Sequence, residues 1–452
     1  MKTPAPVQSA QAVPFGEALR FWLKLGFISF GGPAGQIAIM HRELVERRRW
    51  ISERRFLHAL NYCMLLPGPE AQQLATYIGW LMHRTWGGIV AGVLFVLPSL
   101  FLLIGLSWVY IAHGHVGWIA GLFYGIKPAV AAIVLQAVVR IGARTLRRPS
   151  QAPLLWAIAV FSFVAIAVLD VPFPSVVVAA AIAGALGARR WPAQFVPRSG
   201  HASAQGDGGP AVIDDDTPTP PHALYSRRRL VMVALAGALL WLVPMGALVA
   251  AQGWSSTLTQ MGWFFTKAAL LTFGGAYAVL PYVYQGAVEH FHWLTGPQMI
   301  DGLALGETTP GPLIMVVAFV GFVGGWARQV LGPDALFFGA ALAACVVTWF
   351  TFLPSFLFIL AGGPVVEATH GQMGFTAPLT GVTAAVVGVI ASLALFFLAH
   401  IARPLPQGPI DWVALALAAL AAAALLRWKV GVIPVIAACA LAGLVLRLAG
   451  WA

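Results

Sequence analysis

The chain has 452 residues, of which 59% are hydrophobic and 10% are charged, and its formal net charge is +11. Soluble domains carry about 25% charged residues, so this composition excludes a soluble globular chain and predicts an integral membrane protein. The apolar segments are long and lack the alternation of barrel strands, so we expect an all-α protein. The arginines lie between apolar segments, which indicates membrane topology and argues against nucleic-acid binding.

The first part of the chain predicts a polar terminus followed by one repeat. Residues 1–14 carry no cleavable signal peptide, and we expect them to be mobile. Residues 15–188 form the first repeat, in which short apolar arms flank a Gly-Gly and a Pro-Gly-Pro element. Full spans are expected near 87–112, 116–139, 152–169 and 172–188.

The second part begins with a change of composition. Residues 189–229 are rich in Pro, Gly and Ser, with arginines at both ends, which predicts a flexible cytoplasmic linker. A transmembrane helix over 230–251 has no counterpart before the first repeat. Residues 252–452 form the second repeat, with full spans expected near 335–361, 375–400, 410–427 and 430–449.

The two repeats align without a gap at an offset of 243 residues over their first 60 or so positions. A 13-residue insertion follows, and the alignment then resumes. The matched elements are Lys24 with Lys267, Phe30-Gly31-Gly32 with Phe273-Gly274-Gly275, Pro67-Gly68-Pro69 with Pro310-Gly311-Pro312, and Leu97-Pro98-Ser99 with Leu353-Pro354-Ser355. One extra helix between the copies predicts an inverted-topology repeat, which is common in secondary transporters.

The positions of the arginines bear on two possible topologies. If every pair of arms crosses the membrane as one span, the chain has 13 plain spans, and the segment 41–55 with its six arginines lies outside. If each pair of arms is a re-entrant hairpin, the chain has about nine full spans plus four hairpins, and this segment is cytoplasmic. The hairpin topology fits the positive-inside rule, and the short arms fit it too. Plain spans kinked by Gly and Pro stay the alternative.

Helices broken at membrane depth expose backbone groups that must be buried in protein or line a wet cavity. Four half-helix starts meeting near one axis would bind an oxyanion, because helix N-termini attract negative charge. Simple kinking is the alternative. The candidate binding residues at the breaks are Gly31, Gly32, Ala34, Gly35, Gln36, Pro67, Gly68, Pro69, Gln72, Gly274, Gly275, Thr308, Thr309, Pro310, Gly311 and Pro312.

Four charged residues are candidates for chemistry inside the apolar arms. Lys24 and Lys267 either attract the anion or extend to the membrane interface. Glu70 and Glu307 flank the two Pro-Gly-Pro elements and are candidates for proton coupling, with helix capping as the alternative for Glu70. Asp301 and Lys127 are single charges that we expect at the membrane interface. The histidines and three cysteines form no metal-binding spacing, so no metal or cofactor is expected.

The broken-helix elements resemble those of the chromate ion transporter family in its long two-domain form. The resemblance rests on the motifs FGGPAGQIAIMH (30–41), LPGPEAQQLATYIG (66–79), FGGAYAVLPYV (273–283) and GETTPGPL (306–313). It implies a non-enzymatic, inner-membrane secondary transporter of bacteria that exports chromate, confers chromate resistance and uses the ion gradient. Short single-domain relatives work as pairs, so a homodimer stays open. A permease for sulfate or another oxyanion, and a membrane scaffold or sensor, are the alternatives.

Overall fold

The computed structural model describes residues 13–450, apart from 31, 115, 147, 196–210, 274, 370–375 and 404–407. Within these ranges every regular element is a helix, and one isolated bridge joins Ile51 to Ile213. The prediction of an all-α protein is therefore confirmed. Most of the expected mobile terminus, residues 1–12, lies outside the described part of the chain.

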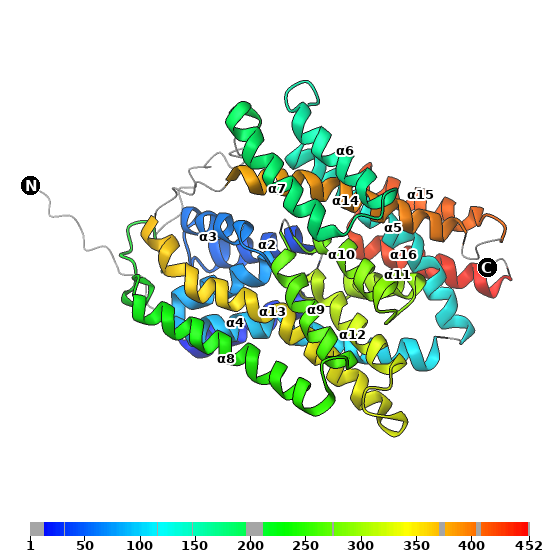
Figure 1. Ribbon diagram of the computed structural model, residues 1–452, viewed down its shortest axis with the longest axis horizontal. Coiled ribbons are helices and arrows are strands. Elements are labelled where there is room, and N and C mark those ends of the chain that lie inside the picture. The colour runs from blue at the N-terminus through cyan, green and yellow to red at the C-terminus, as the bar shows by residue number, and fades with distance from the viewer. Residues whose placement is uncertain are drawn as a thin grey trace, which may run out of the picture.

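The first repeat folds into two broken-helix pairs followed by long helices (Figure 1). Its elements are α1 (Phe15–Ile28), α2 (Gly32–His41), η1 (Arg42–Arg47), α3 (Glu53–Leu65), α4 (Glu70–His113), α5 (Gly117–Thr145), α6 (Pro153–Ala167) and α7 (Phe173–Arg190). The backbone of α4 leaves the helical conformation at His83 and Arg84. Gly79 then faces Gly87, so the chain reverses there and forms a hairpin within α4.

The second repeat follows the same order after one additional helix. Two short turns, η2 (Pro192–Gln194) and η3 (Pro221–Ala223), precede that helix. The remaining elements are α8 (Arg227–Gln252), α9 (Thr257–Leu271), α10 (Ala276–Tyr284), η4 (Gln285–His290), α11 (Gly296–Thr308), η5 (Leu313–Met315), α12 (Val316–Ala327), η6 (Pro333–Ala335), α13 (Leu336–Thr369), α14 (Thr376–Ala402), α15 (Trp412–Leu426) and α16 (Val432–Leu448).

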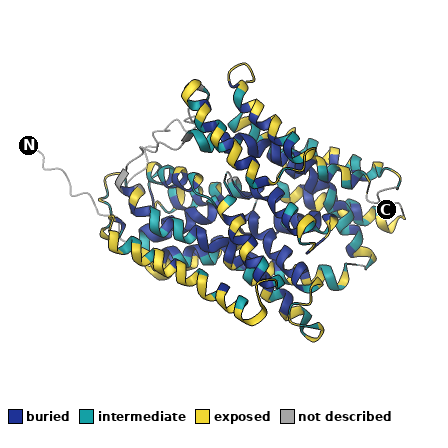
Figure 2. Cartoon of the chain, viewed as in Figure 1, coloured by how far each residue is buried: buried dark blue, intermediate teal, exposed yellow. Residues whose placement is uncertain are grey.

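Six of the described helices are long and apolar enough to cross a membrane, namely α4, α5, α7, α8, α13 and α14. The helices α6, α12, α15 and α16 are apolar but shorter. Large hydrophobic side chains are exposed on the outer helices, with Phe161 at 67% and Val243 at 64%. Figure 2 shows α8 along one edge, mostly exposed. These surfaces suit contact with lipid, so the chain is a multi-pass membrane protein.

Helices of each repeat pack against helices of the other repeat at the centre of the molecule. Helix α16 packs on α5, and in the matching arrangement α7 packs on α14. Glycines permit the close approach: Gly125 lies against Gly443, and Gly381 lies against Gly184. Small residues let helix backbones come together inside membranes, where packing drives helix association. Helices α4 and α13 also pack on each other across the molecule (Figure 1).

The structure corrects part of the linker prediction. Helix α7 continues to Arg190, and Phe195 after it is buried. Further along, Ile213 exchanges backbone hydrogen bonds with the first repeat: its N–H donates to Trp50, and its carbonyl accepts from Ser52. Residues 211–223 are therefore held against the first repeat because their backbone and His222 bond to it, and they are not a flexible tether. Residues 196–210 lie outside the described structure.

Candidate functional site

The two Pro-Gly-Pro turns each touch the broken helix of the other repeat. The N–H of Gly68 donates to the carbonyl of Thr272 at 2.7 Å, and the N–H of Gly311 donates to the carbonyl of Ser29 at 2.8 Å. Ser29 and Thr272 are themselves equivalent positions, as are Gly68 and Gly311. The same contact is thus made twice, and it brings breaks from both repeats together.

The glycines of these breaks have backbone conformations that side chains disfavour. Gly32, Gly68, Gly275 and Gly311 have φ values of 68°, 127°, 97° and 101°. A Cβ on Gly68 would also lie 2.3 Å from Ser355 Oγ. Glycine is required here because it allows a positive φ without a steric penalty. The structure therefore places a helix break at each predicted element, although Gly31 and Gly274 lie outside the described residues.

Buried polar side chains surround the two turns. Gln36 Nε2 donates to the carbonyl of Gly311 at 2.5 Å, and Gln73 Nε2 donates to the carbonyl of Pro67 at 2.8 Å. Buried polar atoms normally have hydrogen-bond partners, so a group of atoms without one suggests a polar ligand. In the described part of the chain, six atoms at or close to the breaks have no such partner: Ser29 Oγ, Gln36 Oε1, Gln72 Oε1, Gln73 Oε1, Ser99 Oγ and Ser355 Oγ.

Backbone N–H groups add donors at the starts of the half-helices. The first helical bond of α4 runs from Gln73 N–H to Pro69, and that of α10 runs from Ala278 N–H to Gly275. The amides just before these donors, at residues 70–72 and 276–277, are the ones that a helix start leaves unsatisfied. The amides of Gly68 and Gly311 are already bonded to the other repeat, so they are not available to a ligand.

The two predicted coupling carboxylates have different surroundings. Glu307 is 5% exposed and accepts a hydrogen bond from the hydroxyl of Tyr277. Glu70 is half-buried, and Gly275 of the other repeat lies beside its Oε1. The hydroxyls of Thr308 and Thr309 donate to carbonyls of their own helix, α11. Both acids therefore lie at the breaks, while the two threonine hydroxyls already have acceptors.

Lys24 and Lys267 do not lie with this group. Lys24 is exposed on the face of α1 that carries Leu23 and Phe27. Lys267 is exposed on α9, and its Nζ lies 5.7 Å from the ring centre of Trp263. Both amines point outward among apolar side chains, as lysines that extend to the membrane interface do. The structure does not bring them to the turns, so we leave them out of the site.

Arg140 and Arg144 were missed by the sequence reasoning and lie closer to the breaks. Both continue the stripe of α5 that includes the buried Ile133 and Ala137, because spacings of three and four residues share a helix face. Both arginines are near enough to Glu70 to interact with it electrostatically, and Arg140 also interacts with Glu307. No obvious signal marked them, since several other arginines occur nearby in the sequence.

The remaining predicted residues support the breaks. A Cβ on Gly35 would lie 2.8 Å from the carbonyl of Phe30, so glycine permits that close approach. Gln72 Nε2 donates to Thr76. Pro67, Pro69, Pro310 and Pro312 form the turns themselves, and the side chain of Ala34 is not described. The repeated Leu-Pro-Ser element was the signal for Ser99 and Ser355, which the sequence reasoning did not place in the site.

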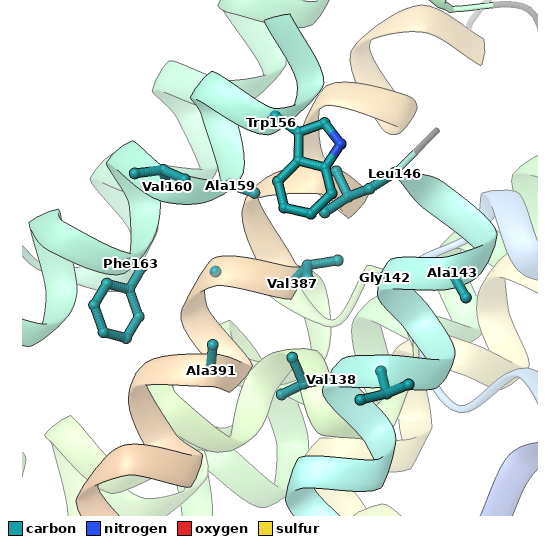
Figure 3. Close-up of a pocket in the computed structure, with 12 residues that line it drawn as sticks. Val138, Gly142, Ala143, Leu146, Trp156, Ala159, Val160, Phe163, Val387 and Ala391 are labelled. Carbon is teal, nitrogen blue, oxygen red and sulfur yellow. The ribbon is translucent and has the colours of Figure 1, made fainter. Parts of the chain in front are cut away.

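A separate groove of about 420 Å³ lies between α5, α6 and α14 (Figure 3). Its lining is apolar apart from the indole of Trp156, with Val138 from α5, Phe163 from α6 and Val387 from α14. It offers no charged group for an anion, so the buried polar cluster is the better candidate site. Within the described residues no three His, Cys, Asp or Glu side chains could hold a metal ion.

Multi-pass helical proteins with broken helices meeting around buried polar groups have the architecture of secondary transporters. The comparisons with known proteins agree with this class. The family model described as chromate transporter matches residues 16–185 and again 259–444. The chain therefore belongs to the chromate transporter family.

Several curated relatives cover nearly the whole chain. The chromate transport protein of Pseudomonas aeruginosa is 34% identical, over 96% of this chain and 94% of its own length. That of Cupriavidus metallidurans is 31% identical, over 85% of this chain and 82% of its own. A probable chromate transport protein of Synechococcus elongatus is 28% identical, over 91% of this chain and 89% of its own length. No solved structure matches the chain.

Proposed function

We propose that this protein is a secondary active transporter that exports chromate across the bacterial inner membrane, driven by the proton gradient, and so confers chromate resistance. One observation carries the proposal: the broken helices of both repeats meet among six buried polar atoms that have no hydrogen-bond partner among the described residues. The three serine hydroxyls among these atoms and the free backbone N–H groups are donors suited to a tetrahedral oxyanion, whereas the three glutamine Oε1 atoms are acceptors and suit water or another donor. The printed names of the relatives support chromate as that anion.

Arg140 supplies the positive charge in this proposal, in place of Lys24 and Lys267, because it is half-buried on α5 whereas Arg144 is exposed. A dianion buried without counter-charge would be costly, whereas a guanidinium matches an oxyanion with two parallel hydrogen bonds. The electrostatic interaction of Arg140 with both Glu70 and Glu307 supports its facing the breaks. Both halves of the site come from one chain, so the proposal needs no second copy of the protein.

The contact between the linker and the first repeat supports the hairpin topology. Thirteen plain spans would put the segment 41–55 outside while the linker stays in the cytoplasm, yet Ser52 and Ile213 are hydrogen-bonded. Two re-entrant hairpins per repeat put both segments on the cytoplasmic side, where their arginines are favoured. We therefore propose inverted repeats with nine full spans, four hairpins and a cytoplasmic linker.

Glu307 and Glu70 are the proposed coupling groups. Each lies next to a break, so the protonation of either carboxylate changes the charge that the anion meets. A proton bound at Glu307 strengthens binding of the anion, and release of that proton weakens it. Proton binding and anion binding are therefore linked, each changing the affinity for the other by the same factor, and through this linkage the proton gradient acts on chromate in this proposal.

The test is chromate uptake into everted membrane vesicles, with and without a pH gradient. We expect wild-type vesicles to accumulate chromate only with the gradient. The double variant Ser99→Ala with Ser355→Ala should lower uptake by about tenfold or more, because each lost hydrogen bond to a charged group is worth about 1.5–3 kcal/mol. Ser107→Ala is the matched control, since Ser107 is equally buried on α4 but two turns from Ser99.

Two outcomes would contradict the proposal. Full uptake by the double serine variant would show that the buried cluster does not bind the anion. Sulfate that competes equally and is accumulated equally would instead identify a sulfate or general oxyanion permease, which uses the same donors.

A further inference from the structure

A second buried charged cluster lies away from the broken helices. Asp301 of α11 is 2% exposed, and its Oδ2 accepts a hydrogen bond from the hydroxyl of Tyr110 at 2.8 Å. Lys127 Nζ lies 3.4 Å from the same oxygen. The other oxygen, Oδ1, is buried without a hydrogen-bond partner among the described residues. Asp301 is thus buried and paired with Lys127, which is partly exposed, whereas we expected two separate charges at the interface.

A cavity of about 220 Å³ lies beside Lys127, and its wall combines apolar and ionisable side chains. Lys127 lines it, and so do Pro297 and Ile300 from the start of α11. Its volume could hold water, and its ionisable side chains offer the hydrogen-bond partners that water needs. Lys127 therefore lies between this cavity and the buried carboxylate. The other ionisable groups of the wall are Tyr124 from α5, His400 from α14, Arg447 from α16, and Asp411.

The groups that face Asp301 come from the elements packed around α11. Lys127 belongs to α5 and Tyr110 to α4, while α12 carries no titratable side chain. In the cavity wall, both oxygens of Asp411 accept from the hydroxyl of Tyr124 at 2.9 Å, so that carboxylate already has a partner. Asp301 keeps a free oxygen, and this makes it the carboxylate best placed to take up a proton.

Asp301 shares α11 with Glu307 of the proposed anion site. Glu307 lies six residues further along α11, which corresponds to about 9 Å along the helix axis and about 120° around it, so the two carboxylates leave the helix on different faces. Glu307 in turn contacts Tyr277 at the start of α10. The cavity, Asp301 and Glu307 therefore follow one another toward the broken helices. Ionisable residues in membrane helices are rare and commonly mark ion or proton pathways.

We propose that Asp301 is a proton-binding site that relays protons between this cavity and Glu307, with Lys127 as its counter-charge. This inference rests on the proposed function. A proton from cavity water binds Asp301 Oδ1, and the neutral acid loses its attraction to Lys127. Transfer of the proton through a chain of several hydrogen-bonded waters to Glu307 restores the carboxylate, and the pair with Lys127 re-forms. The alternative is a purely structural ion pair.

The experiment compares four proteins in vesicles: wild type, Asp301→Asn, Asp301→Asn combined with Lys127→Gln, and the control Asp334→Asn. Asp334 is an exposed carboxylate between α12 and α13. We expect Asp301→Asn to reduce gradient-driven chromate accumulation by about tenfold or more, since proton transfer by a positioned group typically contributes at least that much. Exchange of external for internal chromate without a gradient should continue, because it needs no net proton movement.

The double variant separates the two roles of Asp301. A structural ion pair should be replaced by two neutral side chains without loss, so restored gradient-driven accumulation in the double variant would overturn the relay. Wild-type accumulation in Asp301→Asn alone would overturn it too. Continued exchange without accumulation in both variants supports it.

A second measurement needs no substrate and so separates this inference from the proposed function. Infrared difference spectra of the purified protein, recorded between high and low pH, report the carbonyl band of protonated carboxylic acids. We expect one such band to disappear in Asp301→Asn and to persist in Asp334→Asn. An unchanged spectrum in Asp301→Asn would overturn proton binding at this residue. Absence of chromate uptake by the wild type would contradict only the transport function.

Discussion

At the scale of single residues, polarity alone did not distinguish an anion site from a lipid-facing surface. Lys24 and Lys267 occupy equivalent positions in the two repeats, yet both extend outward beside apolar side chains. Arg140 lies on the inward stripe of α5 instead. The direction of a side chain depends on which helix face is packed, and no feature of the isolated arm reveals that face.

The different placements of Arg140 and Lys24 predict different effects of their substitution on chromate uptake. Arg140→Gln should raise the chromate concentration needed for half-maximal uptake by about tenfold or more, because one hydrogen bond to a charged group is worth about 1.5–3 kcal/mol. Lys24→Gln is the matched control, and it should keep wild-type uptake. The concentration dependence of uptake in everted vesicles measures both. Weaker uptake by Lys24→Gln together with wild-type uptake by Arg140→Gln would show that the lysines, and not Arg140, belong to the site.

At the scale of elements, the breaks were predictable because glycine and proline act locally. A positive φ at Gly68 or Gly311 is favourable only for glycine, and a proline cannot continue a preceding helix. The short arm after Pro67-Gly68-Pro69 and the expected span over 87–112 are separate in the structure, since the chain reverses at His83 and Arg84. The linker was not predictable, because its Pro- and Gly-rich composition gives no sign of docking.

We predict that docking of the linker depends on pH through His222. His222 Nε2 hydrogen-bonds to the carbonyl of Trp80 at 2.9 Å. Burial lowers the pKa of His222, and the positive charges of Arg229 and Arg84 act in the same direction. The neutral form is therefore favoured when the linker is docked. Neutral His222 stabilises the docked linker fully above the ordinary histidine pKa of about 6.5. This stabilisation is lost as the pH falls through the lower pKa that His222 has in the docked state.

A spin label at position 216 of a cysteine-free protein measures this docking. We expect the label to become more mobile as the pH falls below the ordinary histidine pKa of about 6.5. His222→Gln keeps a donor for Trp80 but does not titrate, so its label should show little change with pH. Equal pH dependence in both proteins would exclude His222 as the titrating group.

At the scale of the whole molecule, each repeat is completed by helices of the other. Helix α5 is covered by α15 and α16, while α14 is covered by α6 and α7. Two charged networks also join the repeats. Glu367 of α13 binds Arg55 of α3 at 2.9 Å and Tyr77 of α4 at 2.5 Å, and Asp301 of α11 binds Lys127 and Tyr110. The molecule is therefore one folding unit built from two copies.

Because each repeat is covered by helices of the other, we predict that neither half of the protein is stable alone. If the chain is divided within residues 196–210, each half expressed alone should be degraded or aggregate, because α5 and α14 would lose the small-residue surfaces that cover them. Co-expressed halves should assemble and transport chromate. Co-purification through a tag on one half, followed by size-exclusion chromatography, measures the assembly. A single half that is stable and monodisperse would contradict the prediction.

The sequence by itself determined the membrane class, the duplication, the helix breaks and the family, since composition and local backbone chemistry are properties of short stretches of chain. Only the tertiary structure decided which polar residues meet. Gly68 contacts Thr272 and Gly311 contacts Ser29 because the two copies interlock, and the pairing of Asp301 with Lys127 depends on the same interlocking. Contacts between residues more than 170 positions apart follow from how helices pack, and that packing has no local signal.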